Sequence, residues 1–268
     1  MPLAVCATPI GNLDDVTLRV LAELRDADLV LAEDTRHTRT LLDRHGIRAV
    51  LLSFHEHNEA ARIDEVLPRL AAGERIALVS DAGLPGISDP GTRLVRAARD
   101  AGIEVTVLPG PSAASTALVA SGLGGTRFFF VGFVPRKEGE RRALWDKLAG
   151  WEGVVVAYES PRRLPATLRA LAHHDPEREV VVCRELTKRF EEVVQGTAAE
   201  LAERFAEPPK GEITLVLGAA PGRDGSDLAA AAQAVADLVA AGASRRAAVD
   251  VVAGLTGAPR NELYRRTL

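Results

Sequence analysis

Short runs of apolar residues alternate with helical patterns in the first half of the chain. The runs end in Pro, Gly or acidic residues, which is typical of strands that stop at turns. Between them, apolar residues recur three or four positions apart, as at Val16, Val20 and Leu24, and this spacing predicts amphipathic helices. Strands are expected over residues 3–7, 29–32, 50–54, 76–80 and 105–108. This alternation predicts an α/β fold with a mostly parallel sheet and helices on both of its faces.

The pattern changes at Gly122, Gly124 and Gly125, where a second group of strands begins. These strands are predicted over residues 128–133, 154–158, 180–183 and 213–217. Residues 219–227 are rich in Gly, Pro and Asp, which is typical of a flexible linker. We therefore expect an N-terminal α/β domain over 1–124, a second α/β domain over 125–220 and a helical C-terminal module over 226–268.

The C-terminal module is Ala-rich and shows a helical pattern. Helices are expected over 227–241, 244–254 and 260–267, with Ser244 as an N-cap. The short joint between the last two helices resembles a helix-turn-helix and carries several arginines. Nucleic-acid binding and plain helical or dimer packing both explain this arrangement.

The composition is that of a globular protein. Of 268 residues, 47% are hydrophobic and 26% are charged, which excludes a disordered chain. No run approaches the ~18 consecutive apolar residues of a spanning helix, and the start lacks the basic region of a signal peptide. Cys6 and Cys183 lie in separate apolar runs, so we expect buried free thiols and a reducing, cytoplasmic setting.

The net charge of −4 argues against a general electrostatic binder of nucleic acid. If the protein binds a nucleic acid, it must therefore do so through local patches of basic residues. Turns after the strands of the second domain hold such cations, at Arg136 and Lys137, at Arg162 and Arg163, and at Arg184. A solvated charged face and a surface for a phosphate backbone are both consistent with them.

Polar or Gly-rich loops follow all five strands expected in the first domain. They cover residues 8–15, 33–36, 55–59, 81–91 and 109–114. In an open parallel sheet, ligands bind beyond the carboxyl ends of the strands. The loop over 81–91 is also long, since a βα connection usually takes about 2–6 residues. These loops predict a ligand site at this edge of the sheet.

The loops also exclude some classes of ligand site. No Gly-x-Gly-x-x-Gly follows a strand and no Gly-Lys-Ser/Thr occurs, so nucleotide dehydrogenases and P-loop NTPases are not expected. Gly83 and Gly86 permit close approach of the backbone to a ligand. Asp89 and Pro90 are expected as N-cap and first residue of the next helix. Small residues over 112–115 would expose the N–H groups of another helix start.

Several acidic and imidazole side chains are candidates for chemistry. Asp81 faces a cationic group of a ligand or caps its own loop, and the sequence leaves both open. Glu33 and Asp34 supply a general base or the cap of a helix over 35–44. His55 and His57 are two residues apart and would share a face on a strand, as a pair of metal ligands would, but no third ligand accompanies them at metal spacing, so no metal is expected.

These motifs resemble the ribosomal RNA small subunit methyltransferase I family of the tetrapyrrole methylase superfamily. The resemblance rests on Thr-Pro-Ile-Gly-Asn-Leu at 8–13, Glu-Asp-Thr-Arg-His-Thr at 33–38, His-Glu-His-Asn-Glu at 55–59 and the segment over 80–91. It continues through Pro-Gly-Pro-Ser-Ala at 109–113, Gly-Phe-x-Pro at 132–135, Tyr-Glu-Ser at 158–160, Arg-Glu-Leu-Thr-Lys at 184–188, Lys-Gly-Glu at 210–212 and Asn-x-Leu-Tyr at 261–264. The matches cover nearly the whole chain in the right order.

The resemblance implies two α/β domains with S-adenosylmethionine in the cleft between them, and a homodimer. It implies 2′-O-methylation of a cytidine ribose in 16S rRNA of the small ribosomal subunit. The positions that it implies around the donor are Pro9, Gly11, Asp81, Ala82, Gly83, Ile87, Ser112, Ala113, Ala114, Thr187, Gly211 and Glu212.

The ribose hydroxyl is a poor nucleophile, so a base that takes its proton would help. Candidates for that catalytic role are Glu33, Asp34, Glu185 and Lys188, and the sequence does not choose among them. Candidate contacts to RNA are Arg36, Arg136, Lys137, Arg162, Arg163, Arg184, Arg245 and Arg246. The alternatives are a methyltransferase for a tetrapyrrole or another small acceptor, and a non-catalytic RNA-binding assembly protein.

Overall fold

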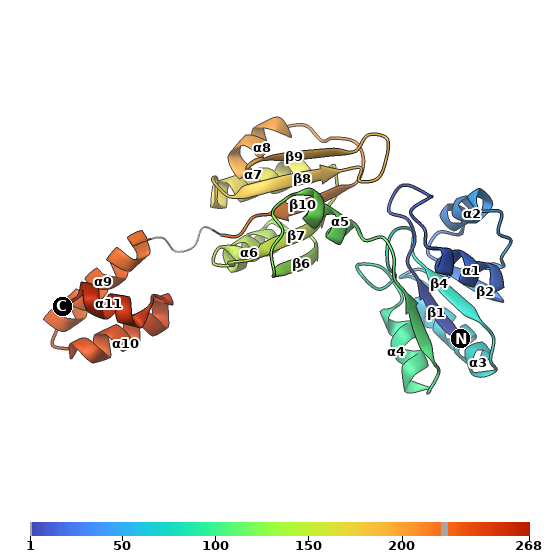
Figure 1. Ribbon diagram of the computed structural model, residues 1–268, viewed down its shortest axis with the longest axis horizontal. Coiled ribbons are helices and arrows are strands. Elements are labelled where there is room, and N and C mark those ends of the chain that lie inside the picture. The colour runs from blue at the N-terminus through green and yellow to red at the C-terminus, as the bar shows by residue number, and fades with distance from the viewer. Residues whose placement is uncertain (1, 221–224) are drawn as a thin grey trace. The chain divides into compact units, whose positions relative to one another are not determined.

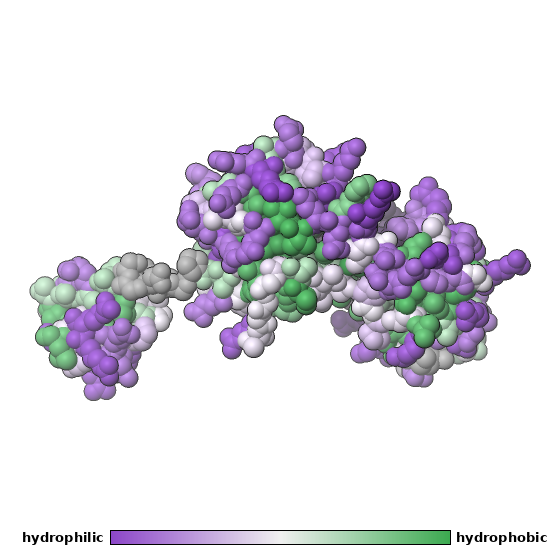
Figure 2. Space-filling model, turned by 45° about the horizontal axis from the view of Figure 1, so that its top comes forward, coloured by the Kyte–Doolittle hydropathy of each residue, from purple (hydrophilic) through white to green (hydrophobic). Residues whose placement is uncertain are grey.

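The computed structural model describes residues 2–220 and 225–268, and for residues 225–227 it describes the backbone only. The chain forms two compact units, one made of Met1–Asp146 and Gly153–Gly218, the other of Lys147–Glu152 and Ala219–Leu268. The larger unit holds two five-stranded sheets, and the smaller unit is helical (Figure 1). Hydrophilic residues cover much of the visible face of the larger unit, with apolar residues between them (Figure 2).

The first sheet is parallel throughout and has the strand order β3-β2-β4-β1-β5. Its strands are β1 (Leu3–Cys6), β2 (Leu29–Ala32), β3 (Leu51–Ser53), β4 (Ile76–Val79) and β5 (Val105–Leu108). All five strands predicted from the apolar runs are therefore confirmed. Strands β1, β2 and β4 are buried along their whole length, which is why they read as continuous apolar runs.

Helices cover both faces of this sheet, as the sequence pattern predicted (Figure 1). Alternate residues of each strand point to opposite faces, so Leu31 belongs to one core and Val30 to the other. The core around Leu31 includes residues of α3 (Glu59–Ala71) and α4 (Thr92–Asp100). The core around Val30 includes residues of α1 (Leu18–Asp26) and α2 (Thr35–Arg44).

Helix α4 begins later than the sequence indicated. Gly91, not Asp89, is its N-cap residue, so the expectation for Asp89 and Pro90 was wrong. Gly91 has φ +131°, which favours glycine, and its N–H donates to Glu59 Oε1 at 3.0 Å. The buried Glu59 carboxylate therefore fixes the helix start and leaves Asp89 in the preceding loop.

The second sheet is mixed and has the order β6-β7-β10-β8-β9. Strands β6 (Phe128–Phe133) and β7 (Val154–Glu159) are parallel, and β10 (Ile213–Leu217) runs antiparallel between β7 and β8 (Glu179–Arg184). The edge strand β9 (Glu192–Thr197) was not predicted. It contains Gln195 and Gly196 and is largely half-buried or exposed, so it lacks the apolar run that marked the other strands.

The helices α6 (Glu138–Leu148), α7 (Leu164–His174) and α8 (Ala198–Arg204) also belong to this part of the chain. Helix α5 (Ala113–Ala120) follows β5 of the first sheet but packs on the second sheet. Its Ala114 and Ala117 share a core with Val156 and Val216, and Ile10 from the loop after β1 joins the same core. Packing thus continues from the first sheet to the second, and the domain boundary at residue 124 stays a prediction.

Both cysteines are free and buried, as expected. Cys6 lies in β1 and Cys183 in β8, so each sheet of the larger unit contains one thiol. Burial raises the pKa of Cys6 to about 12 and that of Cys183 to about 11. The thiol form therefore prevails at neutral pH.

The smaller unit contains α9 (Gly225–Ala240), α10 (Arg245–Thr256) and α11 (Arg260–Arg266). Ser244 caps α10 as predicted, because its hydroxyl accepts from the N–H of Ala247. Apolar residues of the three helices form one core. Of the linker predicted over 219–227, residues 221–224 lie outside the described residues. Within the described ranges, no helix is long and apolar enough to cross a membrane.

Replacement of Leu31 by Ala tests the core of the first sheet. Leu31 is fully buried, so the change should lower the free energy of unfolding by about 2–5 kcal/mol. Urea denaturation followed by circular dichroism measures the loss. The matched control is Leu18→Ala, since Leu18 is 84% exposed and its truncation should stay within about 0.5 kcal/mol. Equal losses at both positions would contradict the assigned core.

Candidate functional site

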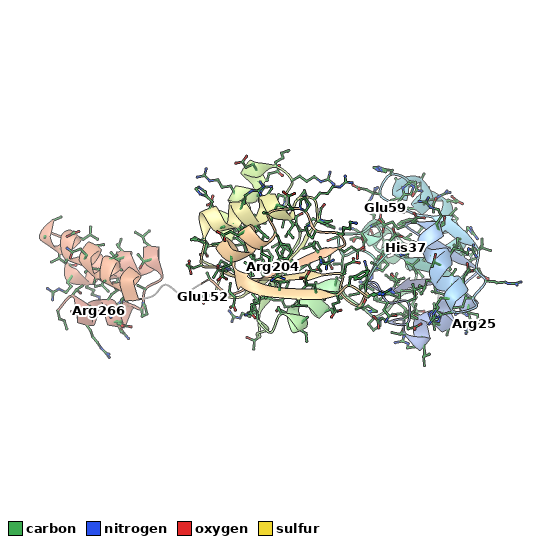
Figure 3. All side chains as sticks on the ribbon, turned by 90° about the horizontal axis from the view of Figure 1, so that it is seen from above. Arg25, His37, Glu59, Glu152, Arg204 and Arg266 are labelled. Atoms are coloured by element: carbon green, nitrogen blue, oxygen red, sulfur yellow. The ribbon has the colours of Figure 1, made fainter. Side chains whose placement is uncertain are left out.

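The carboxyl ends of the first sheet's strands face the second sheet. His37 on α2 and Glu59 at the start of α3 lie on this side of the first sheet, whereas Arg25 near the end of α1 lies on the far side (Figure 3). The loops predicted to form a site therefore meet residues of β7, β10 and the loop after β8. Both sheets contribute to the cavities that lie there.

The loops after β1 and β4 are tied together by a short backbone bridge. Thr8 N–H donates to the Gly83 carbonyl at 2.8 Å, and Gly83 N–H donates to the Thr8 carbonyl at 3.1 Å. The buried Thr8 hydroxyl also donates to the Ser80 carbonyl at 3.0 Å. Gly83 has φ +81°, a conformation that favours glycine. The two loops are thus held as one unit.

The loop after β8 is anchored to the loop after β1. Asn12 N–H donates to Thr187 Oγ1 at 3.0 Å. A Cβ atom on Gly11 would lie 2.5 Å from Lys188 Cγ and 2.9 Å from the Leu186 carbonyl oxygen, so only glycine permits this approach. This contact brings Lys188 to the edge of the first sheet.

The larger cavity has a volume of about 340 Å³, within the usual range of about 300–1,000 Å³ for small-ligand sites. Apolar and aromatic side chains form much of its lining, among them Ile10, Leu84, Ile87, Phe133 and Tyr158. Its remaining lining residues are Glu33, Asp81, Ala82, Gly83, Ser88, Asp89, Ser112, Ala113, Glu159, Ser160, Pro161, Glu212, Ile213 and Thr214. Residues of the first sheet's loops and of β6, β7 and β10 thus enclose one space.

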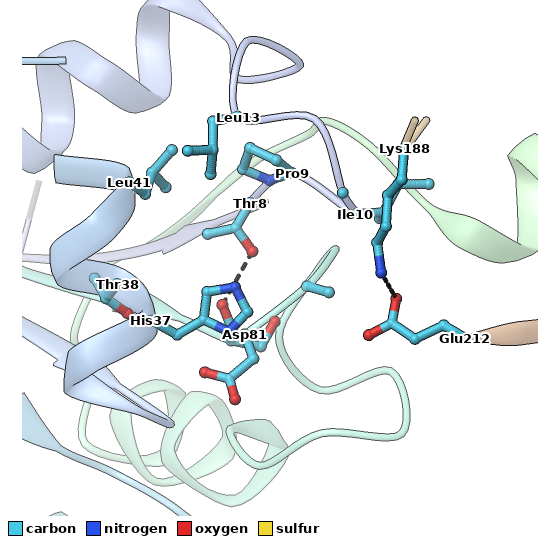
Figure 4. Close-up of a pocket in the computed structure, with 13 residues that line it drawn as sticks. Thr8, Pro9, Ile10, Leu13, His37, Thr38, Leu41, Asp81, Lys188 and Glu212 are labelled. Atoms are coloured by element: carbon cyan, nitrogen blue, oxygen red, sulfur yellow. Dashed lines mark hydrogen bonds and ion pairs between the residues drawn. The ribbon is translucent and has the colours of Figure 1, made fainter. Parts of the chain in front are cut away.

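A smaller cavity of about 110 Å³ lies beside it and is shown in Figure 4. Its lining includes Thr8, Pro9, His37, Leu41 and Lys188. The two cavities share Ile10, Asp81, Ala82 and Glu212. They are therefore adjacent parts of one site.

Five carboxyl groups line the larger cavity, those of Glu33, Asp81, Asp89, Glu159 and Glu212. Asp81 Oδ1 accepts from the Asp34 N–H at 2.9 Å, and Asp81 N–H donates to Glu33 Oε2 at 3.4 Å. Burial raises the pKa of Glu33. Burial, with repulsion by Glu33 and Asp81, raises the pKa of Asp89 to about 7. An acidic group in a largely apolar cavity suits a ligand that carries positive charge.

Asp89 is a site residue that the sequence reasoning missed. It was assigned to a helix cap because Asp-Pro commonly starts a helix. The length of the loop over 81–91 was the available signal, since a loop of that length has room to turn a side chain into the cavity. Phe133, Tyr158 and Ser160 were also missed, because only the spatial approach of the second sheet places them here.

Lys188 links two carboxylates at the edge of the site. Its Nζ lies 2.8 Å from Glu212 Oε2 and 3.0 Å from Glu185 Oε1 (Figure 4 shows the first contact). Partial burial lowers the pKa of Lys188, but the hydrogen bonds to Glu212 and Glu185 outweigh it and leave the pKa above its usual value. Lys188 therefore remains a cation at neutral pH.

The remaining candidates for a base differ in their surroundings. Asp34 caps α2 as one of its expected roles, and its hydrogen bonds to Arg36 lower its pKa. Burial raises the pKa of Glu185, but the Glu212 N–H and Lys188 outweigh it and leave that pKa below its usual value. Among the four candidates, Glu33 alone lines the larger cavity, and Lys188 lines the smaller one.

The positions expected around a methyl donor fall into three groups. Those that line the larger cavity are Asp81, Ala82, Gly83, Ile87, Ser112, Ala113 and Glu212. Pro9 and Gly11 line the smaller cavity. Ala114 is buried in the core under the second sheet, Gly211 packs against Glu185, and Thr187 lines a neighbouring surface depression. Their roles toward a ligand stay predictions.

The cations expected to meet RNA also differ in exposure. Arg136 and Arg162 are exposed, as are Lys137 beside Glu140 and Arg36 beside Asp34. Arg163 instead bonds the buried Glu159 and the Val134 carbonyl, and Arg184 bonds Glu192 and the Lys210 carbonyl. Arg245 and Arg246 begin α10 of the smaller unit.

Comparisons with known proteins give consistent matches. The family model described as Tetrapyrrole (Corrin/Porphyrin) Methylases matches residues 2–202. A Thermotoga maritima protein named ribosomal RNA small subunit methyltransferase I is 48% identical over 216 residues, which cover 80% of this chain and 97% of that protein. Proteins of the same name from Neisseria meningitidis serogroup A and Synechocystis are 42% and 43% identical, covering 98% and 99% of this chain and 91% and 97% of theirs.

Solved structures share the fold over 81% of this chain. The crystal structure of uroporphyrin-III-C-methyltransferase from Thermus thermophilus has a TM-score of 0.57 and 21% identity, and 93% of that chain is covered. The structure of diphthine synthase has a TM-score of 0.62 and 15% identity, and 89% of that chain is covered. At these identities the similarity bears on the fold alone.

Replacement of Asp89 by Asn tests the burial of this carboxyl group. The pKa of Asp89 is raised in the folded state, so below the ordinary carboxyl pKa of about 4 the group is protonated in both states and its burial lowers the stability of the protein little. The free energy of unfolding then falls as pH rises from about 4 through about 7. Asn does not ionise, so the melting temperature of Asp89→Asn should rise relative to the native protein between about pH 5 and about pH 8. Asp100→Asn, at a side chain that is 73% exposed, is the control and should show a flat difference. A flat difference for Asp89→Asn as well would show ordinary ionisation in the folded state.

Proposed function

Since this chain belongs to the tetrapyrrole methylase family, and within it to the ribosomal RNA small subunit methyltransferase I family, we propose that it methylates 16S rRNA in the small ribosomal subunit. The donor is S-adenosylmethionine, and the acceptor is the 2′-hydroxyl of a cytidine ribose. Identity above 40% over nearly the full length of relatives with that name supports the acceptor class. The observation that supports S-adenosylmethionine as the donor is the cavity between the two sheets, which is largely apolar and contains acidic groups.

The lining of the larger cavity fits this donor. When bound, S-adenosylmethionine supplies an electrophilic methyl group on a positively charged sulfur. Glu33 and Asp81 provide carboxylates for the cationic part, which would also favour the ionised form of Asp89. Ile87, Tyr158 and other apolar side chains provide contacts for a flat ring. The bridge between Thr8 and Gly83 fixes the loops that carry these residues, so the site is preorganised.

Glu33 is the base in this proposal. It lines the cavity that would hold the donor, and burial raises its pKa toward the range in which a carboxylate accepts a proton from an alcohol more readily. Asp34 and Glu185 have lowered pKa values and are bonded to neighbours, so they position loops. Lys188 remains charged and contributes a fixed cation at the site edge.

Local cations rather than net charge would hold the RNA. Arg36, Arg136, Lys137 and Arg162 are exposed on the larger unit, and Arg245 and Arg246 start α10 of the smaller unit. Arg163 donates to the Val134 carbonyl after β6, and Arg184 donates to the Lys210 carbonyl before β10, so both support this surface indirectly. Because exposed cations release counterions from phosphate, binding should weaken with added salt.

We further propose a homodimer in the cytoplasm, where small ribosomal subunits are found. Apolar side chains are exposed on three elements that follow one another in the chain. Val107 on the edge strand β5 is 46% exposed, Val119 on α5 is 80% exposed and Phe128 on the edge strand β6 is 45% exposed. Edge strands and exposed apolar side chains are features that a second copy would cover.

Methyl transfer from labelled S-adenosylmethionine tests the activity. Small subunits from cells that lack this chain should accept label, whereas naked 16S rRNA and a tetrapyrrole should accept little. The labelled RNA should resist alkaline cleavage at one cytidine, because a 2′-O-methyl group removes the hydroxyl that attacks the adjacent phosphate. Label on the tetrapyrrole alone, or no label despite donor binding, would contradict the assigned acceptor.

Two substitutions of Asp81 test the donor site. Asp81→Ala removes both the negative charge and the acceptor for the Asp34 N–H, so donor affinity should fall tenfold or more. Asp81→Asn keeps a carbonyl acceptor and removes the charge, so its loss should be smaller but measurable. Titration calorimetry with S-adenosylmethionine gives both affinities. Unchanged affinity in Asp81→Ala would exclude Asp81 from the donor site.

A further inference from the structure

Phe190 is an exposed aromatic side chain beside the candidate site. It lies in the loop between β8 and β9, its surface is 65% exposed, and the chain holds only seven phenylalanines. The guanidinium carbon of Arg189 lies 5.5 Å from the centroid of the Phe190 ring. Arg189 contacts only part of the ring. The rest of the exposed ring is an apolar surface on which another flat group can stack.

The loop that carries Phe190 is held in one conformation by internal contacts. Glu185 and Thr187 adopt left-handed φ angles of 53° and 66°. Thr187 N–H donates to the Glu191 carboxylate at 2.5 Å, and Glu191 N–H donates to the Lys188 carbonyl at 3.1 Å. Such strained conformations persist where the surroundings over-determine them and often mark functional segments. The ring is therefore presented on a preorganised loop.

The loop also forms part of the edge of the site. Lys188 lines the smaller cavity, and both Lys188 and Arg189 line an open depression next to it. Asn12 from the loop after β1 and Arg44 at the end of α2 line the same depression. Phe190 directly follows these lining residues, so a polymer that reaches the site passes close to its ring.

Arg189 is the cation of this loop that can meet an anionic polymer, since Lys188 is paired with Glu185 and Glu212. The carboxylates of the loop have partners within the chain: Glu185 bonds Lys188, and Glu191 accepts from the Thr187 N–H. Glu192, at the start of β9, bonds Arg184 and Arg204 (Arg204 is labelled in Figure 3). In the described part of the chain, no carboxylate lies within ion-pair distance of Arg189. That guanidinium is available to a phosphate while it contacts the Phe190 ring.

We propose that Phe190, together with Arg189, is a stacking platform for an unpaired nucleobase of the RNA that enters the site. This inference rests on the proposed function and adds the residues that would hold a single-stranded segment of the substrate. A flat base stacks on an aromatic ring regardless of its identity, and a neighbouring arginine binds the backbone. The exposed chain neighbour Arg189 is a cation, which suits a nucleic acid better than an apolar protein surface.

Steady-state kinetics with three substitutions test the platform. Phe190→Ala should raise KM for small subunits about tenfold, because base–aromatic stacking contributes substantially to each contact, while kcat and donor affinity stay unchanged. Phe190→Trp should retain the native KM. Phe190→Leu keeps apolar bulk without a ring and should resemble Phe190→Ala. An unchanged KM in Phe190→Ala, or full retention in Phe190→Leu, would overturn the proposal.

A direct binding measurement separates this inference from the proposed function. Tryptophan fluorescence of Phe190→Trp should be quenched by a single-stranded oligoribonucleotide and much less by a duplex, after subtraction of the native signal from Trp145 and Trp151. Quenching without methyl transfer to subunits would refute the proposed function and keep the platform. Methyl transfer without quenching would refute the platform alone.

A matched control and the oligomeric state complete the test. Val193→Ala truncates another exposed side chain, 41% exposed on the adjacent β9, and should leave KM for subunits unchanged. Sedimentation of Phe190→Ala should equal that of the native protein. A change of oligomeric state would show that a second copy of the chain covers the ring, and would overturn the proposal.

Discussion

The bridge between Thr8 and Gly83 is the constraint on which the site depends. Strands β1 and β4 are neighbours at the centre of the first sheet, so the loops that leave them start side by side. Two backbone hydrogen bonds and the buried Thr8 hydroxyl turn this proximity into a fixed geometry. Ile10 then reaches the core under the second sheet, and Asp81 and Ala82 line both cavities. A local contact of two residues thereby fixes the loops that the first sheet contributes to the site.

The ion pairs of Lys188, at the edge of the site formed by the second sheet, position a loop more than they stabilise the protein. Lys188 lies between Glu185 and Glu212, and Glu185 also accepts from the Glu212 N–H. Partly buried pairs of this kind add little net stability, because desolvation offsets much of the attraction. Their effect is to hold the loop after β8 against β10. This keeps Thr187 in its left-handed backbone conformation, in which its Oγ1 accepts the hydrogen bond from the Asn12 N–H.

The sequence predicted the first sheet well because its central strands are buried on both faces and therefore read as apolar runs. It missed β9 because an edge strand with Gln195 and Gly196 shows no such run. The site residues divide in the same way, into those that a local sequence pattern indicates and those that only tertiary contacts bring together. Glu33 and Asp81 could be predicted, because their loops follow strands of one parallel sheet. Phe133 and Tyr158 could not, since no pattern along the chain gives the distance between the two sheets, and Asp89 was misplaced because the Glu59 contact that shifts the start of α4 is tertiary.

The two buried thiols give each sheet its own chemical reporter. Cys6 lies in β1 of the first sheet and Cys183 in β8 of the second, and each thiol is held protonated by its apolar surroundings. Because thiolate is the reactive form, alkylating reagents would modify neither cysteine until its strand opened. The labelling rates of the two cysteines would therefore follow the opening of the two sheets separately, and would show whether they unfold together or in sequence.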